Sequence, residues 1–196
     1  VTNSNQVKST IEKIVLQYGG LDKLISNAGV FPESINLASI SEKKWKEDLE
    51  SNLTSHHHIL KHSIPFLKNG IDSSVVFVGT RNVGAPGPGA GTYTIAKSGL
   101  TQMARLAAIE LAPLNIRVNI VHPDCVYDTE IWSEKILSER SRQYGITIEE
   151  YISRNLLKKP VSAKNVADMV RFLIGKSSSK TTGAQIPVDG GNDRII

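Results

Sequence analysis

The sequence predicts a doubly wound α/β fold, in which helices cover both faces of a parallel β-sheet. Stretches of helical periodicity alternate along the chain with short apolar runs of strand length, such as residues 75–78. This alternation is typical of parallel strands joined by helical crossovers. Small and polar residues follow three of the runs, at positions 27–29, 80 and 123–129. Because the carboxyl ends of parallel strands meet at one edge of a sheet, we expect these segments to converge in one crevice.

Length and composition fit one soluble domain over residues 1–196. Of the 196 residues, 40% are hydrophobic and 21% are charged, as in ordinary globular proteins. The net charge of +4 comes from 23 basic and 19 acidic residues spread along the chain, which indicates no nucleic-acid partner. The apolar runs are too short for a membrane span, so we expect no membrane association. The single cysteine, Cys125, excludes an intrachain disulfide and favours a cytoplasmic location.

The first two predicted elements are a helix and a strand. Apolar residues recur at helical spacing over residues 4–18, where Ser4 is a candidate cap and Gly19-Gly20 ends the pattern. A short apolar run over residues 21–26 then predicts a strand that meets a turn at residues 27–29.

A long helix and a second strand follow. Ser39 and Glu42 match a capping box, and the helical pattern continues to about residue 67. Residues 75–79 predict a strand, after which a loop rich in Gly and Pro leads to a helix over residues 90–112.

The last third of the chain continues the alternation. Residues 116–121 predict a strand, and the chain beyond it is irregular or locally helical, with a second capping box at Thr147 and Glu150. A helix around residues 163–174 and a strand near residues 184–188 complete the pattern.

Tyr93 and Lys97 are the most informative side chains, because they lie four residues apart at a predicted helix start. On a helix this spacing puts a phenol and an ammonium on one face, where the cation favours the phenolate. Taken alone, such a pair is more often two solvated surface neighbours. The preceding strand and the Gly/Pro-rich loop favour a site at the edge of the sheet.

Several motifs, in this order, resemble those of the short-chain dehydrogenase/reductase family. They are Asn27-Ala28-Gly29 after a strand, Asn52 in the long helix, Thr80, Tyr93 with Lys97, Arg117-Val118-Asn119 with Pro123, and Val188-Asp189-Gly190-Gly191. The match covers nearly the whole chain. It implies a Rossmann-like domain and an oxidoreductase that uses NAD or NADP to interconvert an alcohol and a carbonyl by hydride transfer.

The resemblance implies a catalytic role for four residues. Tyr93 would exchange a proton with the substrate oxygen, and Lys97 would lower the pKa of that phenol and bond the nicotinamide ribose. The residue matching Asn52 holds a water in the family's proton relay, although Asn52 also fits a helix kink or a wet face. Thr80 stands where the family usually has serine. Its hydroxyl can still donate to the substrate oxygen, or it simply ends a strand.

The resemblance also implies cofactor contacts at Asn27, Ala28, Gly29, Tyr93, Lys97, Pro123, Val126 and Thr129. The turn at residues 27–29 would bring its backbone close to the adenosine half of the cofactor, where glycine permits near approach. Val126 would offer its backbone to the carboxamide, with the Thr129 side chain nearby. Here Pro123-Asp124 replaces the family's usual Pro-Gly, and the segment is slightly longer than usual.

One part of the family's fold has no counterpart in the sequence. Members begin with a strand and a glycine-rich turn that receives the pyrophosphate at a helix N-terminus, and nothing before residue 27 matches that turn. We therefore expect an N-terminally truncated chain, the carboxyl-terminal part of a longer polypeptide, with an exposed apolar edge at residues 21–26. Alone it should bind nicotinamide nucleotides weakly or not at all, and the residue that selects NAD or NADP cannot be identified.

A narrower resemblance is to the dehydrogenase part of bifunctional rhamnulose-1-phosphate aldolase/alcohol dehydrogenase proteins. It rests on the runs at 81–90, 122–132 and 181–194. It implies an upstream aldolase-type domain in the complete protein and a small hydroxyaldehyde, such as lactaldehyde, as substrate. In this hypothesis residues 130–157 form a substrate lid that includes Trp132. Alternatively, Trp132 simply covers the core.

Two other functions stay open. A related epimerase or dehydratase would use the same cofactor and the same Tyr93–Lys97 pair, but the short chain and the Asp-Gly-Gly ending favour a simple dehydrogenase. A non-catalytic fragment would instead act as an interaction module through its exposed edge or its two long helices. By the resemblance, the helices over residues 39–67 and 90–112 form the interfaces of a homo-oligomer.

Four further residues attract attention but predict no site. Cys125 is interpreted as a small buried residue, since nothing adjacent supports a nucleophile. His56, His57 and His58 are consecutive on a predicted helix, where neighbours point about 100° apart, so they make poor metal ligands. We therefore expect no metal.

Overall fold

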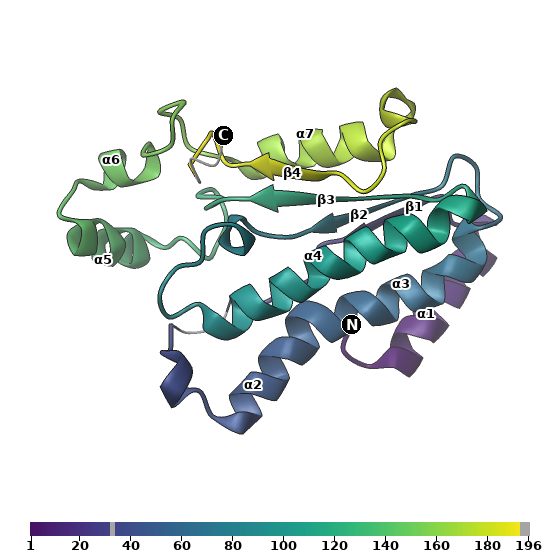
Figure 1. Ribbon diagram of the computed structural model, residues 1–196, viewed down its shortest axis with the longest axis horizontal. Coiled ribbons are helices and arrows are strands. Elements are labelled where there is room, and N and C mark those ends of the chain that lie inside the picture. Colours follow the sequence, from purple (N-terminus) through teal and green to yellow (C-terminus); the bar gives the residue numbers. More distant parts are fainter. Residues whose placement is uncertain (32–33, 193–196) are drawn as a thin grey trace.

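The computed structural model describes residues 1–31 and 34–192, and these residues contain a four-stranded parallel sheet (Figure 1). The strands are β1 (Lys23–Ser26), β2 (Ser74–Val78), β3 (Arg117–Pro123) and β4 (Gln185–Val188), and they lie side by side in that order. Each predicted strand is present, with ends within two residues of those expected. Residues 193 and 194, which belong to the run at 181–194, lie outside the described residues.

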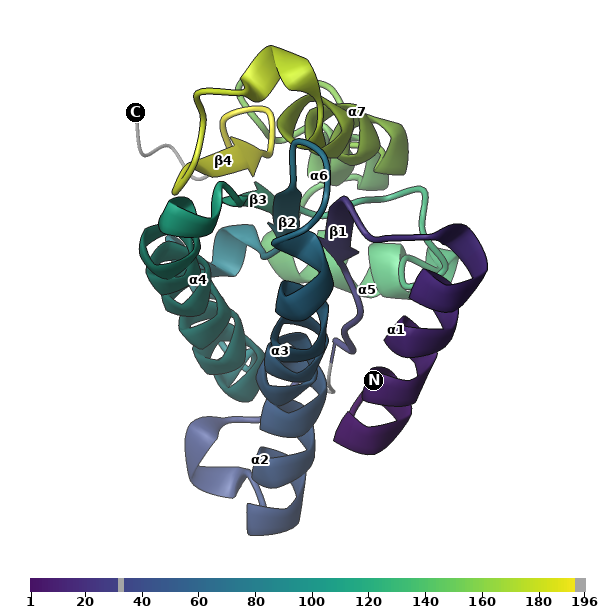
Figure 2. The ribbon, with the colours of Figure 1, turned by 90° about the vertical axis from the view of Figure 1, so that its right-hand side faces the viewer.

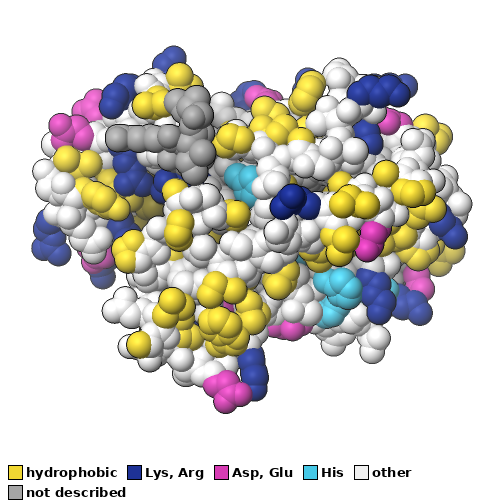
Figure 3. Space-filling model, in the orientation of Figure 1, with side chains coloured by type: hydrophobic (Ala, Val, Ile, Leu, Met, Phe, Trp, Pro, Cys, Tyr) yellow, Lys and Arg dark blue, Asp and Glu magenta, His cyan; other side chains and the backbone are white. Residues whose placement is uncertain are grey.

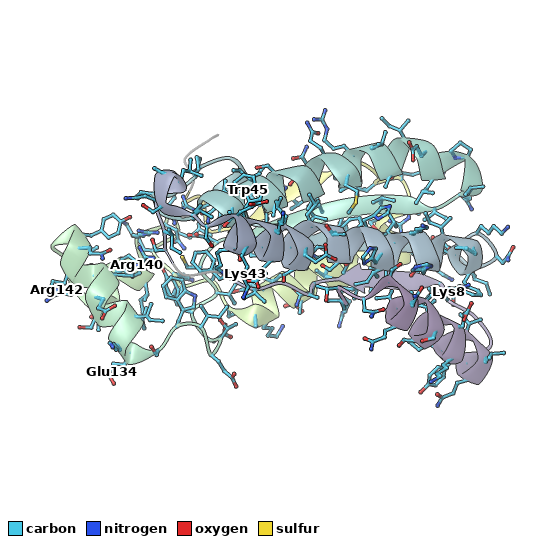
Figure 4. All side chains as sticks on the ribbon, turned by 90° about the horizontal axis from the view of Figure 1, so that it is seen from below. Lys8, Lys43, Trp45, Glu134, Arg140 and Arg142 are labelled. Carbon is cyan, nitrogen blue, oxygen red and sulfur yellow. The ribbon has the colours of Figure 1, made fainter. Side chains whose placement is uncertain are left out.

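Helices cover both faces of the sheet. α1 (Ser4–Tyr18), α3 (Ser55–Leu67) and α4 (Gly91–Leu111) lie on one face, and α7 (Ala163–Ile174) lies on the other (Figure 2). Seen from below, α1, α3 and α4 run side by side, while α5 (Glu134–Tyr144) projects beyond one end of the sheet (Figure 4). This is the doubly wound α/β arrangement that the sequence predicts.

The core lies between these layers. On one face of β2, Val75 and Phe77 pack with Leu100 of α4, and all three are fully buried. On the other face, Val76 packs with Leu173 of α7. Successive residues of β2 thus point to opposite faces, and both sets are apolar, as expected for a central strand of a parallel sheet.

Most predicted element ends agree with the structure. Gly19 ends α1 with a left-handed φ of +83°, a conformation that glycine adopts without strain. The capping box of Thr147 and Glu150 is confirmed at the start of α6 (Ile148–Ile152). The predicted cap of α1 is wrong, because Asn3 and not Ser4 precedes the helix and accepts the hydrogen bond from its first turn.

The predicted capping box at Ser39 and Glu42 is also wrong. Residues Leu37–Ser39 form a separate 3-10 turn, and α2 (Glu42–Leu49) begins three residues later than expected. Ser41 is the actual cap, and its Oγ accepts a hydrogen bond from Lys44 N at 3.2 Å. Both serines fit a cap by residue type, and only the path of the preceding turn selects Ser41.

A π-helical turn, Glu50–Thr54, joins α2 to α3. A π-turn closes its hydrogen bonds one residue later than an α-helical turn, so it rotates the side chains that follow it. Asn52 lies in this turn and His56 lies just after it, and both are fully buried. The long helix predicted over residues 39–67 is therefore interrupted, and the interruption turns two polar side chains into the interior.

Apolar side chains reach the surface at one edge of the sheet and along α4. β1 lies at one edge of the sheet, and the side chain of Ile25 on it is 48% exposed. On the face drawn in Figure 3, basic and acidic side chains are interspersed, and hydrophobic ones are spread along the course of α4. Within residues 1–31 and 34–192, no helix has the length and apolar character needed to cross a membrane.

Candidate active site

The carboxyl ends of the strands meet at the edge of the sheet that lies nearest to α5 and α6 (Figure 1). Asn27 follows β1, Thr80 lies two residues beyond the end of β2, and Pro123 ends β3. Tyr93 and Lys97 lie in the first two turns of α4, which begins at the same edge. The predicted convergence of these distant segments is confirmed.

Tyr93 and Thr80 bring two hydroxyl groups together. Thr80 lies close enough to Tyr93 for its side chain to oppose the rise in the pKa of the phenol, and Thr80 Oγ1 accepts from Asn82 N at 3.3 Å. The ring of Phe31 packs edge-on against Tyr93, with 4.9 Å between ring centroids. Because each hydroxyl can both donate and accept, this pair can bind one substrate oxygen from two directions.

The protonation of Tyr93 differs from the expectation. Burial raises the pKa of Tyr93, the side chain of Thr80 partly opposes this rise, and the nearby Cys125 adds to it. The lowering of this pKa expected from Lys97 is not found in the present arrangement of side chains. The phenol is therefore held in its protonated form at neutral pH, which suits a proton donor.

Lys97 lies one helical turn after Tyr93 on α4 and is buried, with only 3% of the residue exposed. Its Nζ donates to Val78 O at 3.0 Å and lies 3.4 Å from His56 Nε2. Burial lowers the pKa of Lys97 from 10.5 to about 8. The ammonium is thus mostly charged at pH 7 and close to its titration.

Asn52 ties the π-turn to the segment after β1. Its Oδ1 accepts from Val30 N at 3.0 Å, and its Nδ2 donates to Val30 O at 2.9 Å and to Asp48 O at 3.1 Å. Of the sequence-based interpretations, a helix irregularity fits, whereas a wet face does not, because Asn52 is fully buried. Its part in a proton relay stays a prediction.

Gly29 lets the turn after β1 come close to these polar groups. A Cβ at Gly29 would lie 3.0 Å from Asn52 Oδ1 and 3.5 Å from Lys97 Nζ. The first distance is tighter than ordinary contact, so only glycine leaves this approach free. Asn27 and Gly29 are exposed and Ala28 is partly exposed. An exposed backbone next to the lysine is suited to the close approach of a flat cofactor ring.

His56 belongs to the site, although the sequence analysis did not connect it with Lys97. Its Nδ1 lies 2.6 Å from Ser26 Oγ, and its Nε2 faces Lys97. Burial, followed by the charge of Lys97, lowers the pKa of His56 to about 3, and a hydrogen bond with the Ala28 backbone opposes this shift. The ring is therefore neutral at pH 7. The next residue, His57, is exposed. The sequence of three consecutive histidines does not indicate which of them is buried.

The loop after β3 is held by an ion pair that the sequence analysis also missed. Arg81 Nε donates to Asp124 Oδ1 at 2.8 Å, and Asn192 Nδ2 donates to the other carboxylate oxygen. Asp124 follows Pro123, at the position where the resemblance leads one to expect glycine. Its carboxylate joins the segments that follow β2, β3 and β4.

Val126 and Thr129 lie together in one turn of this loop. Thr129 Oγ1 donates to Val126 O at 2.8 Å, and Val126 forms a parallel bridge with Val161. The structure thus places the two residues side by side after β3. Their contacts with a cofactor stay a prediction.

Aromatic side chains line the segment between this loop and α6. The ring of Trp132 lies 5.0 Å from that of Tyr127 and 6.4 Å from that of Tyr151. The guanidinium of Arg154 lies 4.7 Å from the centre of the Tyr151 ring. Trp132 therefore packs within an aromatic cluster, and a lid role for residues 130–157 stays a prediction.

Cys125 is a poor nucleophile in this setting. Burial, with an added contribution from Asp124, raises the pKa of Cys125 to about 12. Since the thiolate is the reactive form, the structure agrees with the expected lack of a nucleophilic role, although the side chain is only partly and not fully buried.

Comparison with known proteins agrees with this geometry. The family model described as Enoyl-(Acyl carrier protein) reductase matches residues 1–193. The 3-oxoacyl-[acyl-carrier-protein] reductase FabG of Thermotoga maritima is 34% identical over 192 residues, which cover 97% of this chain and 74% of that protein. The oxidoreductase YuxG of Bacillus subtilis is 32% identical over 97% of this chain, and the chain spans 28% of the length of YuxG.

A solved structure has the same fold. Carveol dehydrogenase from Mycobacterium avium, determined in complex with NAD, superposes with a TM-score of 0.89 at 28% sequence identity. The match covers 97% of this chain and 72% of that one.

Proposed function

The chain belongs to the short-chain dehydrogenase/reductase family, and from this premise we propose that it is an NAD(P)-dependent oxidoreductase that interconverts an alcohol and a carbonyl. The observation that carries the proposal is the meeting of Tyr93 and Thr80 at the carboxyl edge of the sheet, with the buried Lys97 one helical turn after Tyr93 on α4. Acid/base chemistry at an oxygen atom needs a positioned proton donor and a charge that stabilises its conjugate base. These three side chains provide both.

Thr80, Tyr93 and Lys97 would have different roles at the substrate oxygen. In the direction of reduction, Thr80 and Tyr93 would donate hydrogen bonds to the carbonyl, and Tyr93 would release its proton to the developing alkoxide. Burial favours the protonated phenol before that step, as the raised pKa of Tyr93 indicates. We propose that Lys97, one helical turn away, favours the remaining phenolate once substrate and cofactor are bound, since the present arrangement of side chains shows no lowering of this pKa by Lys97.

The nicotinamide cofactor would supply the hydride that adds to the substrate carbon. We assign its contacts to the turn Asn27, Ala28 and Gly29, to Tyr93 and Lys97 on α4, and to Pro123, Val126 and Thr129 after β3. Support comes from the absence of a side chain at Gly29, which leaves the backbone open beside Lys97. Both NAD and NADP fit this assignment. Asn52 stabilises the turn at residues 27–29 through its two hydrogen bonds with the backbone of Val30.

The proposed substrate is a small hydroxyaldehyde such as lactaldehyde, and an aldolase-type domain is the proposed neighbour in the complete protein. Support comes from the resemblance of three sequence runs and from YuxG, of which this chain spans 28%. A panel that compares lactaldehyde with 3-oxoacyl thioesters distinguishes this substrate from that named for the Thermotoga maritima reductase.

We further propose that the protein forms a homo-oligomer through α4. Leu106 and Ile109 project from this helix with 54% and 73% exposure. Such side chains lose unfavourable contact with water when a second copy covers them. Light scattering at micromolar concentration should give a multiple of the chain mass, and replacement of Ile109 by Lys should shift it towards the monomer. A monomeric wild-type protein would contradict the proposal.

Replacement of Tyr93 by Phe tests the proposed reaction. In the complete protein, the variant keeps the ring packed against Phe31 and loses only the hydroxyl, so turnover should fall by about 10²- to 10⁴-fold while the protein stays folded. Turnover is measured from nicotinamide absorbance, and nucleotide binding from calorimetry. Tyr18→Phe on α1, where the side chain is 73% exposed, is the matched control and should behave as wild type. Unchanged turnover in Tyr93→Phe removes Tyr93 from the mechanism.

A further inference from the structure

A series of buried polar groups runs beneath the candidate site from β1 to α4. Ser26 Oγ lies 2.6 Å from His56 Nδ1, His56 Nε2 lies 3.4 Å from Lys97 Nζ, and Lys97 Nζ donates to Val78 O at 3.0 Å. Ser26, His56 and Lys97 are all buried, with at most 3% exposure. They come from three different elements, so their meeting depends on the tertiary fold.

The donor and acceptor inventory fixes the direction of these contacts. An ammonium group has only donors, so His56 must accept at Nε2 and carry its proton on Nδ1. The Nδ1–H group then donates towards Ser26 Oγ. Phe77 packs edge-on against the imidazole, with 6.1 Å between ring centroids, and keeps the ring in this plane. Lys97 thus has a side-chain acceptor, His56, whose ring orientation is fixed by Ser26 and Phe77.

The titratable groups around Lys97 come from three elements. They are His56 on α3, His122 on β3 and Tyr93 on α4 itself. Burial lowers the pKa of both histidines, so neither carries a charge at pH 7. Within residues 1–31 and 34–192, the side-chain contact found for Lys97 is this imidazole and not a carboxylate.

A neutral acceptor has a consequence that a carboxylate would not have. A carboxylate would hold Lys97 just as well, but its negative charge would cancel most of the field that the ammonium exerts on any negative charge that develops nearby. An imidazole fixes the position of Nζ and leaves its full charge. The interior therefore keeps a positioned cation without neutralising it.

We propose that His56 is a positioning residue that holds the Lys97 ammonium in place, one helical turn after Tyr93, with Ser26 fixing the orientation of the imidazole. The effect of His56 on catalysis rests on the proposed oxidoreductase function. The contact between His56 and Lys97 does not, so the two are tested separately.

The contact is tested by NMR on the whole chain, with no cofactor or substrate added. The titration of Lys97 is followed through its ¹³Cε shift in wild type, His56→Leu and His56→Gln. Leucine removes the acceptor, so the pKa of Lys97 should fall by roughly one unit below its value of about 8. Glutamine restores an acceptor oxygen and should return the titration most of the way to wild type. His57→Leu changes the exposed neighbour and should have no effect.

The opposite substitution keeps the test valid if His56→Leu does not fold. In Lys97→Met, the ¹⁵N shift of His56 Nε2 should move because its donor is lost, while Nδ1 stays protonated. An unchanged Lys97 titration in a folded His56→Leu protein, or an unchanged Nε2 shift in Lys97→Met, overturns the proposal.

The kinetic consequence is measured in the complete protein, in the direction of alcohol oxidation. His56→Leu should lower kcat by about tenfold, because a hydrogen bond to a charged group is lost. It should also move the rise of kcat to higher pH, since the phenolate of Tyr93 is less favoured, with little change in KM for the alcohol. His56→Gln should recover most of kcat, which a purely structural role would not produce. An inactive wild-type protein counts against the proposed function only, and normal kcat and pH profile in His56→Leu overturn the positioning role.

Discussion

The two sides of the candidate site are built in different ways. The lysine side, which comprises Ser26, Asn52, His56 and Lys97, lies on strands and helices, is buried, and bonds mainly to other elements of the fold. The loop side, which comprises Thr80, Arg81, Asp124, Val126 and Thr129, lies after the ends of β2 and β3 and is less buried. Rigid elements hold a group to within a fraction of an ångström, whereas loops tolerate substitution. The part that handles charge is thus fixed, and the part that would meet different substrates can vary.

Acidification should destabilise the lysine side, and this is the largest effect that we expect. The pKa of His56 is lowered from 6.5 to about 3. Between these pH values His56 is protonated in the unfolded chain but neutral in the native chain. Stability contributed by neutral His56 is therefore complete above pH 6.5 and falls as the pH drops towards 3, by about 1.4 kcal/mol per unit. The total loss over this range is about 5 kcal/mol. Urea unfolding followed by circular dichroism at pH 7, 5.5 and 4 measures it.

Matched variants separate this effect from the protonation of carboxylates. His56→Gln removes the titrating ring and should flatten the difference between pH 7 and pH 4. His57→Gln, at an exposed position of the same helix, should keep the wild-type slope. Equal slopes in wild type and His56→Gln would show that His56 is not the group that fails in acid.

The fold was largely predictable because its signals are local. Each helix or strand carries apolar residues at regular spacing that point to one face, as Leu100 on α4 and Val75 on β2 do. This spacing can be read from a single sequence. The errors at Ser4 and Ser39 are also local. Several nearby residues could cap each helix, and the turn before the helix selects one of them.

The site was only partly predictable, because some of its contacts have no sequence period. Tyr93 and Lys97 were found from their spacing on one helix. His56 was not found, because a π-turn rotates its side chain inward. A prediction that assumes 3.6 residues per turn does not include such a turn. The contact between Arg81 and Asp124 joins residues 43 positions apart, and either residue alone looks like an ordinary surface charge. Pairing of that kind is visible only when the strands are placed side by side.

Removal of the Asp124 carboxylate should break the loop side with a smaller effect on stability. Its side chain is 9% exposed and that of Arg81 is 18% exposed, so Asp124→Ala leaves a guanidinium with little access to water and no ion-pair partner. We expect a loss of about 2 kcal/mol in unfolding free energy, below the loss for a fully buried pair. The measurement is urea unfolding at pH 7.

The same variant should leave the lysine side intact, which the ¹³Cε titration of Lys97 checks. Asp168→Ala removes the exposed partner of Lys164 and is the control for loss of a surface ion pair, with a midpoint equal to wild type. A normal midpoint in Asp124→Ala would mean that the loops after β2 and β3 do not depend on this pair.

Replacement of Thr80 by Ser should give the smallest effect and tests how tolerant the loop side is. Serine keeps the hydroxyl next to Tyr93 and removes one methyl group from a position that is 9% exposed, so stability should fall by about 0.5 to 1 kcal/mol. Turnover should stay within about threefold of wild type, because the donor and acceptor set is the same. Thr80→Val keeps the shape and loses the hydroxyl, and it should lower turnover by about tenfold or more. Equal turnover in Thr80→Val and Thr80→Ser would place Thr80 in the wall of the site and leave Tyr93 as the donor that acts on the substrate oxygen.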